Sequence, residues 1–599
     1  MSETGRGDKR PDLYSIFKPK THPQKRKAEA STEPAKRRKP RSLSDLLDEF
    51  PIEVLKSEGV DVEVIRESSD ELLCSFFRTL SNKDEEAQVA ICGGFAYFPA
   101  YNLSVQCSEP NMFRLNCVVP HGVSAITDLL KATQHNPKTV DCVLLQFELL
   151  SGESGTEASV KPSSADEALQ PFHLYRMFQN QTARLKQEGL QLSYELLRNS
   201  QEAVVKCELA GIHFDTEAHR GLMAVWHSQS QNSETELRAE LGEINFNSTK
   251  QLSEALANYI KKKRLEGLLD KWPVSQTGQL KTDSATLKFH ADDPELEKVV
   301  SNLLEYRTAT KLLSSFGHSL NSYVINSRIH TKFKLNGAVT GRLSSSEPNL
   351  QNIPHSVEFR KLFTAPPGRE IVVGDYSQIE LRVVALLAHD TDMIGVFDRN
   401  QDMHQYTAAS ILNVPEDSVS NEQRRLAKAV NFGLLYGQGA NSFSRYAQSN
   451  FDVKLSLSEA KAYISKFYRT FPGLKVWQES LKNAKVVNTP LGRKRRTSIP
   501  MEKQNTTIQG GAAEVMLKLL GKLRVMLHEH DCVLVNVVHD EVILEVAEAE
   551  AGTCCRKLKR LMQEAWNEFT QEAQFGSVNW DVAKVASGPD WGQCKETLS

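Results

Sequence analysis

An aspartate at position 375 stands where a carboxylate could reach a metal ion. It follows the apolar segment Ile371–Val373, which we interpret as a short buried strand, and Ile379, Val383 and Leu386 then recur with helical spacing. A carboxylate at the end of a buried strand can leave the core and offer hard oxygen ligands. Many α/β folds contain such a strand–Asp–helix unit, so this motif alone is weak evidence for a metal site.

A second acidic pair, Asp540 and Glu541, lies between the apolar runs 533–538 and 542–546. The alternating apolar residues predict a β-hairpin with His539 and Asp540 at its tip. His-Asp is not a favoured pair for the tightest hairpin turns, which indicates that the turn alone does not explain these residues. Taken by itself, however, Asp540 is more simply interpreted as an ordinary turn residue.

Four side chains share one face of a helix predicted over residues 424–436. Arg424, Lys428, Phe432 and Tyr436 recur at every fourth residue and form a stripe about 18 Å long. Two cations followed by two aromatic rings fit neither a core stripe nor a solvated helix face. The order suits a nucleoside triphosphate, with the phosphates on the cations and the base on the rings.

The elements that must position these residues belong to a chain of 599 residues, which is enough for about four domains. Strands and helices alternate after about residue 365, and helices dominate before it. Helical spacing is found at 173–199, 202–210, 249–264 and 294–315. A small α/β unit is expected near 50–150, with strands at 87–98, 113–119 and 140–150 and a polar loop at 152–166.

The composition excludes several classes of protein. Hydrophobic residues make up 40% and charged residues 25%, as in soluble globular proteins. No segment approaches the ~20 consecutive apolar residues of a membrane-spanning helix, and no apolar run follows Met1, so neither membrane insertion nor secretion is expected. The ten cysteines include no CxxC pair, which argues against a zinc ribbon or a disulfide framework and favours a reducing compartment.

The charge is distributed unevenly. Residues 1–41 carry 13 basic and 5 acidic side chains, or +8, which leaves −10 for the rest of a chain whose total is −2. Residues 1–45 are predicted to be a disordered tail. Its two basic clusters, Lys25–Lys27 and Lys36–Lys39, resemble a bipartite nuclear import signal, although a basic tail touching DNA phosphates is the alternative. A mitochondrion or a viral replication compartment is the other location considered.

A short apolar segment, Leu13–Phe17, interrupts this tail. Within residues 10–18 it loosely resembles a sliding-clamp-binding peptide, although Arg10 stands where such peptides usually have Gln. A clamp is therefore a candidate partner, since short apolar segments dock into grooves of partner proteins. Packing against the rest of the same chain is the simpler alternative.

Together the three motifs resemble those of family A DNA polymerases. Residues 375–382 are similar to motif A, 424–437 to the fingers helix of motif B, and 538–541 to motif C. Phe432 is typical of the bacterial repair polymerases, whereas the animal lesion-bypass branch usually has Tyr there. The resemblance covers roughly residues 200–599. Further similar blocks are 246–252, 304–307, 340–354, 402–404, 491–496 and 505–510.

The resemblance implies an α/β (mixed α+β) fold of the right-hand polymerase type. The thumb would cover about 191–330 and the palm and fingers about 331–599, preceded by an RNase H-like exonuclease-type domain at 46–190. The implied activity is DNA-directed DNA synthesis by a monomer, with primer–template DNA and deoxynucleoside triphosphates as substrates. Two Mg²⁺ ions about 3.5–4 Å apart would stabilise the attacking and leaving oxygens.

The resemblance also assigns roles to single residues. Asp375, Asp540 and the Tyr376 carbonyl would bind the metal ions, and Glu541 would support them. Lys428 would protonate the leaving pyrophosphate, so Asp375, Asp540 and Lys428 are the implied catalytic residues. The implied nucleotide-binding residues are Arg424, Lys428, Phe432, Tyr436, His404, Gln378 and Glu380, of which Glu380 would exclude a ribose 2′-OH. The implied DNA-binding residues are Arg342, Asn349, Gln351, Asn505, Gln509, His539 and Arg493.

The N-terminal half departs from the proofreading members of this family. Their 3′–5′ exonuclease needs an Asp-x-Glu on its first strand and two further aspartates. The corresponding segment here, 89–96, has no carboxylate, 142–149 offers only Glu148, and 173–179 lacks the Tyr-x3-Asp arrangement. We therefore expect a degenerate exonuclease-like domain without proofreading activity, and no separate 5′ flap nuclease.

Three other functions were weighed. A catalytically weak or inactive scaffold that binds DNA and a clamp would not need Asp375, Asp540, Lys428 and Arg424 together. A two-metal nuclease would need more clustered carboxylates and has no use for the aromatic rings. An RNA polymerase of the same superfamily is disfavoured by Glu380 and Phe432.

Overall fold

The computed structural model describes residues 53–57, 60–65, 88–92, 95–99, 103–106, 116–119, 122, 125–127, 139–151, 157–160 and 167–598, except 271, 291 and 292. The chain divides into two compact units, Met1–Tyr194 and Glu195–Ser599, and each is described by itself. The predicted basic tail, its import-like clusters and the clamp-like segment 10–18 lie outside the described residues. None of the described helices is both long and apolar enough to cross a membrane.

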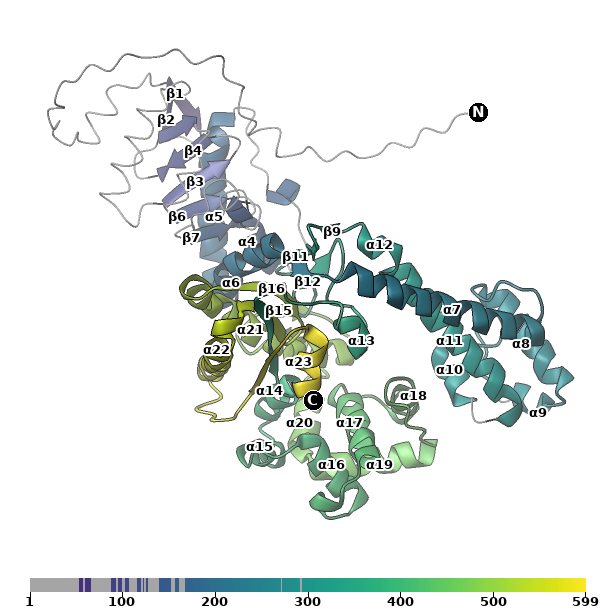
Figure 1. The fold of residues 1–599 in the computed structure, drawn as a ribbon. Helices are drawn as coiled ribbons and strands as arrows, with labels where there is room; N and C mark the ends of the chain where they lie inside the picture. Colours follow the sequence, from purple (N-terminus) through teal and green to yellow (C-terminus); the bar gives the residue numbers. More distant parts are fainter. Residues whose placement is uncertain are drawn as a thin grey trace, which may run out of the picture. The chain divides into compact units, whose positions relative to one another are not determined.

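The N-terminal unit is built on a mixed sheet (Figure 1). The described strands lie in the order β1-β2-β5-β4-β3-β6-β7. β3, β4 and β5 pair antiparallel, whereas β3, β6 and β7 pair parallel. The strands are β1 (Glu53–Ser57), β2 (Val60–Ile65), β3 (Gln88–Cys92), β4 (Phe95–Phe98), β5 (Leu103–Gln106), β6 (Asn116–Val119) and β7 (Thr139–Cys142).

The expectation of a strand at 140–150 was wrong for most of its length. The strand predicted at 140–150 ends at Cys142, and α4 (Val143–Ser151) follows, because a short run that is apolar on all sides suits a buried helix as well as a strand. Glu148 is therefore a buried helix residue. The sequence interpretation also overlooked Asp141 on β7, a buried carboxylate that accepts a hydrogen bond from Tyr194 Oη at 3.0 Å.

The predicted helix 173–199 is two helices, α5 (Gln170–Gln187) and α6 (Gln191–Ala210). They are separated at Gly189, whose φ of 67° is the left-handed conformation typical of helix ends. The break expected near residues 200–201 does not occur, and the Ser200 hydroxyl instead donates to the Leu197 carbonyl within α6 at 2.9 Å. Inside the predicted loop 152–166, Glu157–Val160 form the 3-10 helix η4.

The second unit contains the sheet that carries the acidic motifs. Its strands lie in the order β16-β17-β13-β18 and all pair antiparallel. They are β13 (Arg369–Tyr376), β16 (Cys532–Val538), β17 (Glu541–Ala547) and β18 (Ala583–Gly588). The hairpin predicted from the alternating pattern is thus confirmed as β16 and β17. Asp375 lies inside β13, not beyond its end, because β18 continues to pair with Asp375 and Tyr376.

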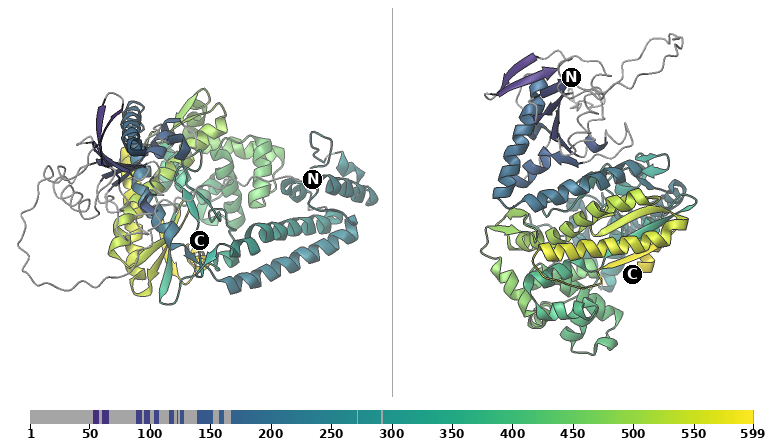
Figure 2. Two further views of the ribbon diagram at one scale, coloured as in Figure 1. Left: turned by 90° about the horizontal axis from the view of Figure 1, so that it is seen from above. Right: turned by 90° about the vertical axis from the view of Figure 1, so that its left-hand side faces the viewer.

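Helices cover this sheet. The long helices α21 (Pro500–Glu529) and α22 (Ala551–Glu572) run side by side (Figure 2), and α22 packs on β13 and β18. The approach is close at Gly374, where an added Cβ would lie 2.8 Å from Leu558 Cδ2 and from Met562 Sδ. α13 (Val357–Arg360) and α23 (Trp591–Leu598) pack against each other, and Phe359 and Trp591 join Ile371 and Val373 in one buried cluster.

Two further groups of elements complete the unit. α7 and α11 run side by side, and α8, α9 and α10 lie at one end of this pair (Figure 1). These are α7 (Thr216–Leu241), α8 (Thr249–Lys262), α9 (Glu266–Leu269), α10 (Ser284–Phe289) and α11 (Pro294–Phe316). The second group is α14 (Ile379–Ala388), α15 (Thr391–Asp398), α16 (Met403–Leu412), η6 (Glu416–Ser418), α17 (Asn421–Leu435), α18 (Ala440–Phe451), α19 (Leu457–Thr470) and α20 (Pro472–Ser480). Short connecting elements are β8 (Ile212–His213), α12 (His318–Asn321), β9 (Val324–Ile325), β10 (Arg328–Ile329), β11 (Lys332–Lys334), β12 (Ser344–Ser346), β14 (Val486–Asn488), β15 (Lys494–Arg496) and η7 (Glu548–Glu550).

Candidate active site

The pairing of β13 with β17 brings the two acidic motifs together. Asp375 on β13 lies directly opposite Glu541 on β17. The Tyr376 backbone N–H donates to the Asp540 carbonyl at 3.1 Å, so the hairpin tip meets the same edge of the sheet. His539, which precedes Asp540, takes a left-handed φ of 54°. The four residues expected to hold metal ions (Asp375, Tyr376, Asp540 and Glu541) therefore lie together, as the sequence predicts.

These carboxylates form a site with an excess of negative charge. Burial and the charge of Asp375 raise the pKa of Asp540 to about 7, and burial raises the pKa of Glu541. Within the described part of the chain, no ion pair reaches Asp540. Because carboxylates in a partly buried group disfavour one another's ionisation, the site is suited to bind cations.

One lysine partly compensates this charge, and the sequence interpretation missed it. Lys595 on α23 forms ion pairs with Asp375 and, at 3.0 Å, with Glu541 Oε2. Trp591, one turn earlier on α23, donates its indole N–H to Glu541 Oε1. Neither residue belongs to a motif that signals a site, and Lys595 is 220 residues from Asp375 in the chain. Only the fold reveals this contact.

The predicted helix is confirmed as α17. The helix begins after Ser420, whose side chain forms a capping box with Gln423, and Tyr436 caps its C-terminal end. Lys428 is exposed and Phe432 is half-buried, so both remain available to a ligand. The Phe432 ring lies 5.7 Å from the ring of His404, which places the predicted aromatic and imidazole contacts next to each other.

Burial favours a neutral imidazole at His404. Its side chain is buried, and burial lowers its pKa to about 4. The Asn431 amide nitrogen lies 2.8 Å from His404 Nδ1, so Nδ1 accepts and Nε2 carries the proton. His404 can therefore donate a hydrogen bond to a ligand oxygen without supplying a positive charge.

Asp402 ties the nucleotide-site candidates to one another, a role that the sequence interpretation did not assign. Its Oδ1 atom accepts from the Gln405 backbone at the start of α16. Its Oδ2 atom accepts from Arg424 at 2.7 Å and from the Gln378 amide at 3.3 Å. Asp402 thus fixes Arg424, one of the two stripe cations, beside the αL residue Gln378 that precedes α14.

Glu380 is held from two sides. It lies on the first turn of α14, as predicted, and pairs with Arg342. Tyr436 donates its hydroxyl to the other Glu380 oxygen, and the Gln509 amide donates to Tyr436 Oη at 3.3 Å. Burial, followed by the charge of Glu380, raises the pKa of Tyr436 well above its usual value. Four predicted site residues thus form one connected network.

Other residues predicted to contact DNA are engaged within the protein. Gln351 is buried and its amide donates to the Val537 carbonyl at 3.2 Å. Asn349 Oδ1 accepts from the Gln351 backbone at 3.0 Å, and Arg493 donates to Asn336. These contacts position the loop after β12 and the turn before β15. His539 is exposed and Asn505 half-buried. The buried Asn505 Oδ1 has no hydrogen-bond partner among the described residues.

Comparisons with known proteins agree with this geometry. The family model described as DNA polymerase family A matches residues 216–593. DNA polymerase I of Aquifex aeolicus (strain VF5) is 33% identical over 359 residues, which is 56% of this chain and 60% of that protein. The thermostable DNA polymerase I of Thermus aquaticus is 31% identical over 446 residues, which is 70% of this chain and 51% of that protein. The chain thus spans about half to three-fifths of the length of these relatives.

A solved structure shares the fold. It is described as the POL domain of Pol1 from M. smegmatis in complex with DNA primer-template and dNTP. It matches with a TM-score of 0.73 at 22% identity, over 88% of this chain and 100% of that chain. The mixed α and β polymerase fold predicted from the sequence is confirmed by this match.

Replacing Lys595 should destabilise the metal-free protein, because the carboxylates of the site then lack their neighbouring cation. Lys595→Met removes the cation that Asp375 and Glu541 share, so the metal-free protein should lose on the order of 3 kcal/mol of stability. The loss should be larger at about pH 8 than at about pH 5, because carboxylates with raised pKa values are then ionised. Urea unfolding in a chelating buffer measures it.

Lys584→Met is the matched control for this measurement. Lys584 is an exposed lysine on the adjacent strand β18 whose ammonium donates to the Leu598 carbonyl at 3.0 Å. It should leave stability nearly unchanged at both pH values. Equal stability of Lys595→Met and the wild type at about pH 8 would contradict the assigned role of Lys595.

Proposed function

Because this chain belongs to DNA polymerase family A, we propose that it is a DNA-directed DNA polymerase that adds deoxynucleotides to a primer 3′ end. The observation that carries the proposal is the meeting of Asp375 and Asp540 at one sheet edge, joined to the α17 stripe through the Tyr436–Glu380 hydrogen bond. A two-metal carboxylate site beside a cation–aromatic stripe suits nucleotidyl transfer. It suits a nuclease or an inactive scaffold less well.

The residues present fit divalent metal ions, specifically two Mg²⁺. Asp375, Asp540 and the Tyr376 carbonyl would bind them and Glu541 would support the site, because Mg²⁺ prefers hard oxygen ligands. The raised pKa of Asp540, caused first by burial and then by the charge of Asp375, is compatible with this fit, because a bound cation would favour the ionised carboxylate. When bound, the ions would stabilise the charge that develops on the phosphate oxygens.

The nucleotide-binding role falls to the α17 stripe and its neighbours. The exposed Lys428 would pair with the triphosphate and protonate the leaving pyrophosphate. Arg424, held in place by Asp402, would bind the phosphates, and His404 would donate to them through Nε2 as a neutral group. Phe432 would stack beside the sugar and base, since its ring is half-buried next to His404.

The DNA substrate would lie across the loop after β12, the β14–β15 hairpin and the start of α21. Arg342, Gln509 and the exposed His539 are the candidates for direct contact, and the unpartnered Asn505 oxygen supports a further one. Asn349, Gln351 and Arg493, like Arg342 and Gln509, form hydrogen bonds within the protein, so they would also position these segments.

Proofreading is proposed to be absent. In the described part of the N-terminal unit, Asp141 is bonded to Tyr194 and Glu148 lies on a helix. An exonuclease-type domain that has lost its metal ligands is compatible with the mixed sheet observed.

Residues 1–41 support two further proposals by their sequence alone. The clusters Lys25–Lys27 and Lys36–Lys39 favour nuclear import, and the segment 10–18 makes a sliding clamp a candidate partner. The relatives named above are bacterial, which points away from a nucleus. The location of a reporter fused to residues 1–41 tests import, and a mitochondrial location would oppose it.

The central test is primer extension with matched substitutions. Asp375→Asn and Asp540→Asn should each abolish extension in Mg²⁺ while primer–template binding persists, because each removes an anionic metal ligand and keeps the side-chain shape. Asp392→Asn, at an exposed aspartate on the first turn of α15, should retain full activity. Substantial extension by either site variant would refute the assignment.

The same preparations test proofreading. A mismatched primer should keep its length with the wild-type protein in Mg²⁺ or Mn²⁺, since the segments 89–96, 142–149 and 173–179 lack the carboxylate pattern of a 3′–5′ exonuclease. Shortening that persists in the Asp540→Asn variant would place an active exonuclease in the N-terminal unit and overturn this part of the proposal.

Sugar selection should depend on Glu380. Glu380→Ala should raise ribonucleotide incorporation at least ~10-fold, equivalent to ~1.4 kcal/mol of discrimination, because the side chain would close the space beside C2′ of the sugar. Tyr436→Phe removes only the hydroxyl that holds Glu380 and should give a smaller increase, since Arg342 still binds the carboxylate. Phe432→Tyr should instead improve dideoxynucleotide use.

Values of kcat/KM for deoxy-, ribo- and dideoxynucleotides on one template separate these effects. Glu422→Gln, at an exposed position in the first turn of α17, serves as the control and should leave all three values unchanged. Equal losses for all three nucleotides in the Glu380→Ala variant would mean that Glu380 only maintains the fold.

A further inference from the structure

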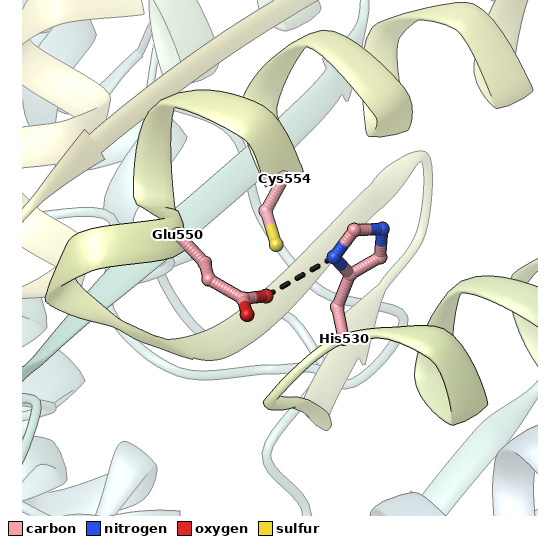
Figure 3. A group of neighbouring side chains, drawn as sticks. All are labelled: His530, Glu550 and Cys554. Atoms are coloured by element: carbon pink, nitrogen blue, oxygen red, sulfur yellow. Dashed lines mark hydrogen bonds and ion pairs between the residues drawn. The ribbon is translucent and has the colours of Figure 1, made fainter.

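A second cluster of potential metal ligands lies away from the carboxylate site. His530, Glu550 and Cys554 each present one ligand atom, and these atoms all lie within 4.8 Å of one another. The imidazole, the carboxylate and the sulfur face a common space (Figure 3). Among the described residues, no other group of three or more His, Cys, Asp or Glu side chains has its ligand atoms this close together.

A second thiol adjoins the cluster. The thiol of Cys532 lies beside that of Cys554, and both side chains are buried. Cys532 Sγ also lies 3.6 Å from the Met526 carbonyl. The cluster offers an imidazole, a carboxylate and a sulfur atom, and Cys532 adds a second buried sulfur next to it. Borderline-soft divalent cations prefer such a donor set.

The backbone around the cluster is set by three regular elements. His530 directly follows α21, Cys532 begins β16, and Glu550 precedes α22, whose first turn carries Cys554. α21 and α22 pack against each other, and β16 is paired with β17 along its length. Ligands on rigid elements can hold a metal ion without a large loss of chain entropy.

The two thiols are not suited to chemistry of their own. Burial raises the pKa of Cys532 to about 12 and also raises the pKa of Cys554. Reactive cysteines need a lowered pKa, so neither nucleophilic catalysis nor redox sensing fits these two. A metal ion can still displace the thiol protons. Apolar packing alone also does not explain why a hydrogen-bonded His530–Glu550 pair lies beside two buried thiols.

We propose that His530, Cys532, Glu550 and Cys554 bind one Zn²⁺ ion as a structural site. Zinc bonds of about 2.0–2.3 Å in a tetrahedron place the ligand atoms about 3.3–3.8 Å apart. The three ligand atoms within 4.8 Å of one another need small side-chain shifts to reach this spacing, and the Cys532 thiol must move toward them to supply the fourth ligand. Binding releases the two thiol protons to solvent. The ring proton of His530 moves from Nδ1, which faces Glu550 at 3.0 Å, to Nε2.

The surrounding charges are compatible with this ion. Two thiolates, one carboxylate and Zn²⁺ sum to one negative charge, and the Lys557 ammonium lies 3.2 Å from His530 Nε2. Lys557 is also ion-paired with Glu529, which can hold the ammonium when Nε2 carries the proton. Asp531 is engaged by Arg369 at 2.9 Å.

Metal analysis of the full-length chain tests the proposal. Protein stripped with a chelator and dialysed against Zn²⁺ should retain one zinc per chain. Co²⁺ in its place should give the absorption of a cobalt–thiolate bond. Cys554→Ser and His530→Gln, the latter at a half-buried residue, should each weaken Zn²⁺ binding by more than about 100-fold. Each removes a ligand, whereas the loss of a residue that only hydrogen-bonds a ligand already weakens metal binding about 10–100-fold.

Two controls make the outcome decisive. Cys594→Ser, at a buried thiol that donates to the Ile371 carbonyl at 3.3 Å outside the cluster, should keep the zinc. Asp375→Asn should also keep the zinc and the cobalt–thiolate band, which separates this site from catalytic metal binding. Wild-type protein that retains no Zn²⁺, or a folded Cys554→Ser variant with unchanged affinity and cobalt spectrum, would overturn the proposal.

Discussion

The antiparallel pairing of β13 with β17 is the constraint on which the rest of the site depends. It sets Asp375 opposite Glu541 and brings the Asp540 tip to the same edge. Carboxylates gathered in a partly buried place oppose one another's ionisation, so such a cluster is stable only where cations neutralise it. Lys595 supplies part of that positive charge. The negative charge that remains would destabilise an ordinary protein core. Here it makes this sheet edge suitable for binding divalent cations.

A second network connects this sheet with the helix that carries the stripe. Glu380 receives bonds from Arg342 and Tyr436, and Gln509 bonds Tyr436 in turn. These residues come from the loop before β12, α14, the end of α17 and α21. Because Tyr436 caps α17, movement of that helix must either break this hydrogen bond or carry Glu380 with it. The residue expected to sense the sugar is thus coupled to the position of the nucleotide-binding helix.

Features of the site could be predicted from the sequence where the pattern lies within one helix or strand, and not where residues of separate elements meet. Alternating apolar residues predicted the β16–β17 hairpin, and the four-residue spacing predicted the α17 stripe, because both patterns lie within single elements. The same reasoning failed at 143–151, where a short apolar run does not distinguish a strand from a helix. Lys595 was missed because its partners lie far away in the chain, and Asp402 was missed because its contacts with Arg424 and Gln378, 22 and 24 residues away, join separate elements. The zinc ligands lack CxxC spacing for the same reason, since three separate elements supply them.

β16 links the proposed zinc site to the carboxylate site. It begins at Cys532 and ends at Val538, two residues before Asp540, a span of about 23 Å for a strand of this length. Its register with β17 already shifts between Leu534 and Asn536, so the pairing is not uniform. A one-residue slip would turn side chains to the opposite face of the sheet and misplace Asp540 relative to Asp375. A metal ion that fastens Cys532 to the start of α22 would resist such a slip, and it would thereby stabilise the catalytic edge without contributing a ligand to it.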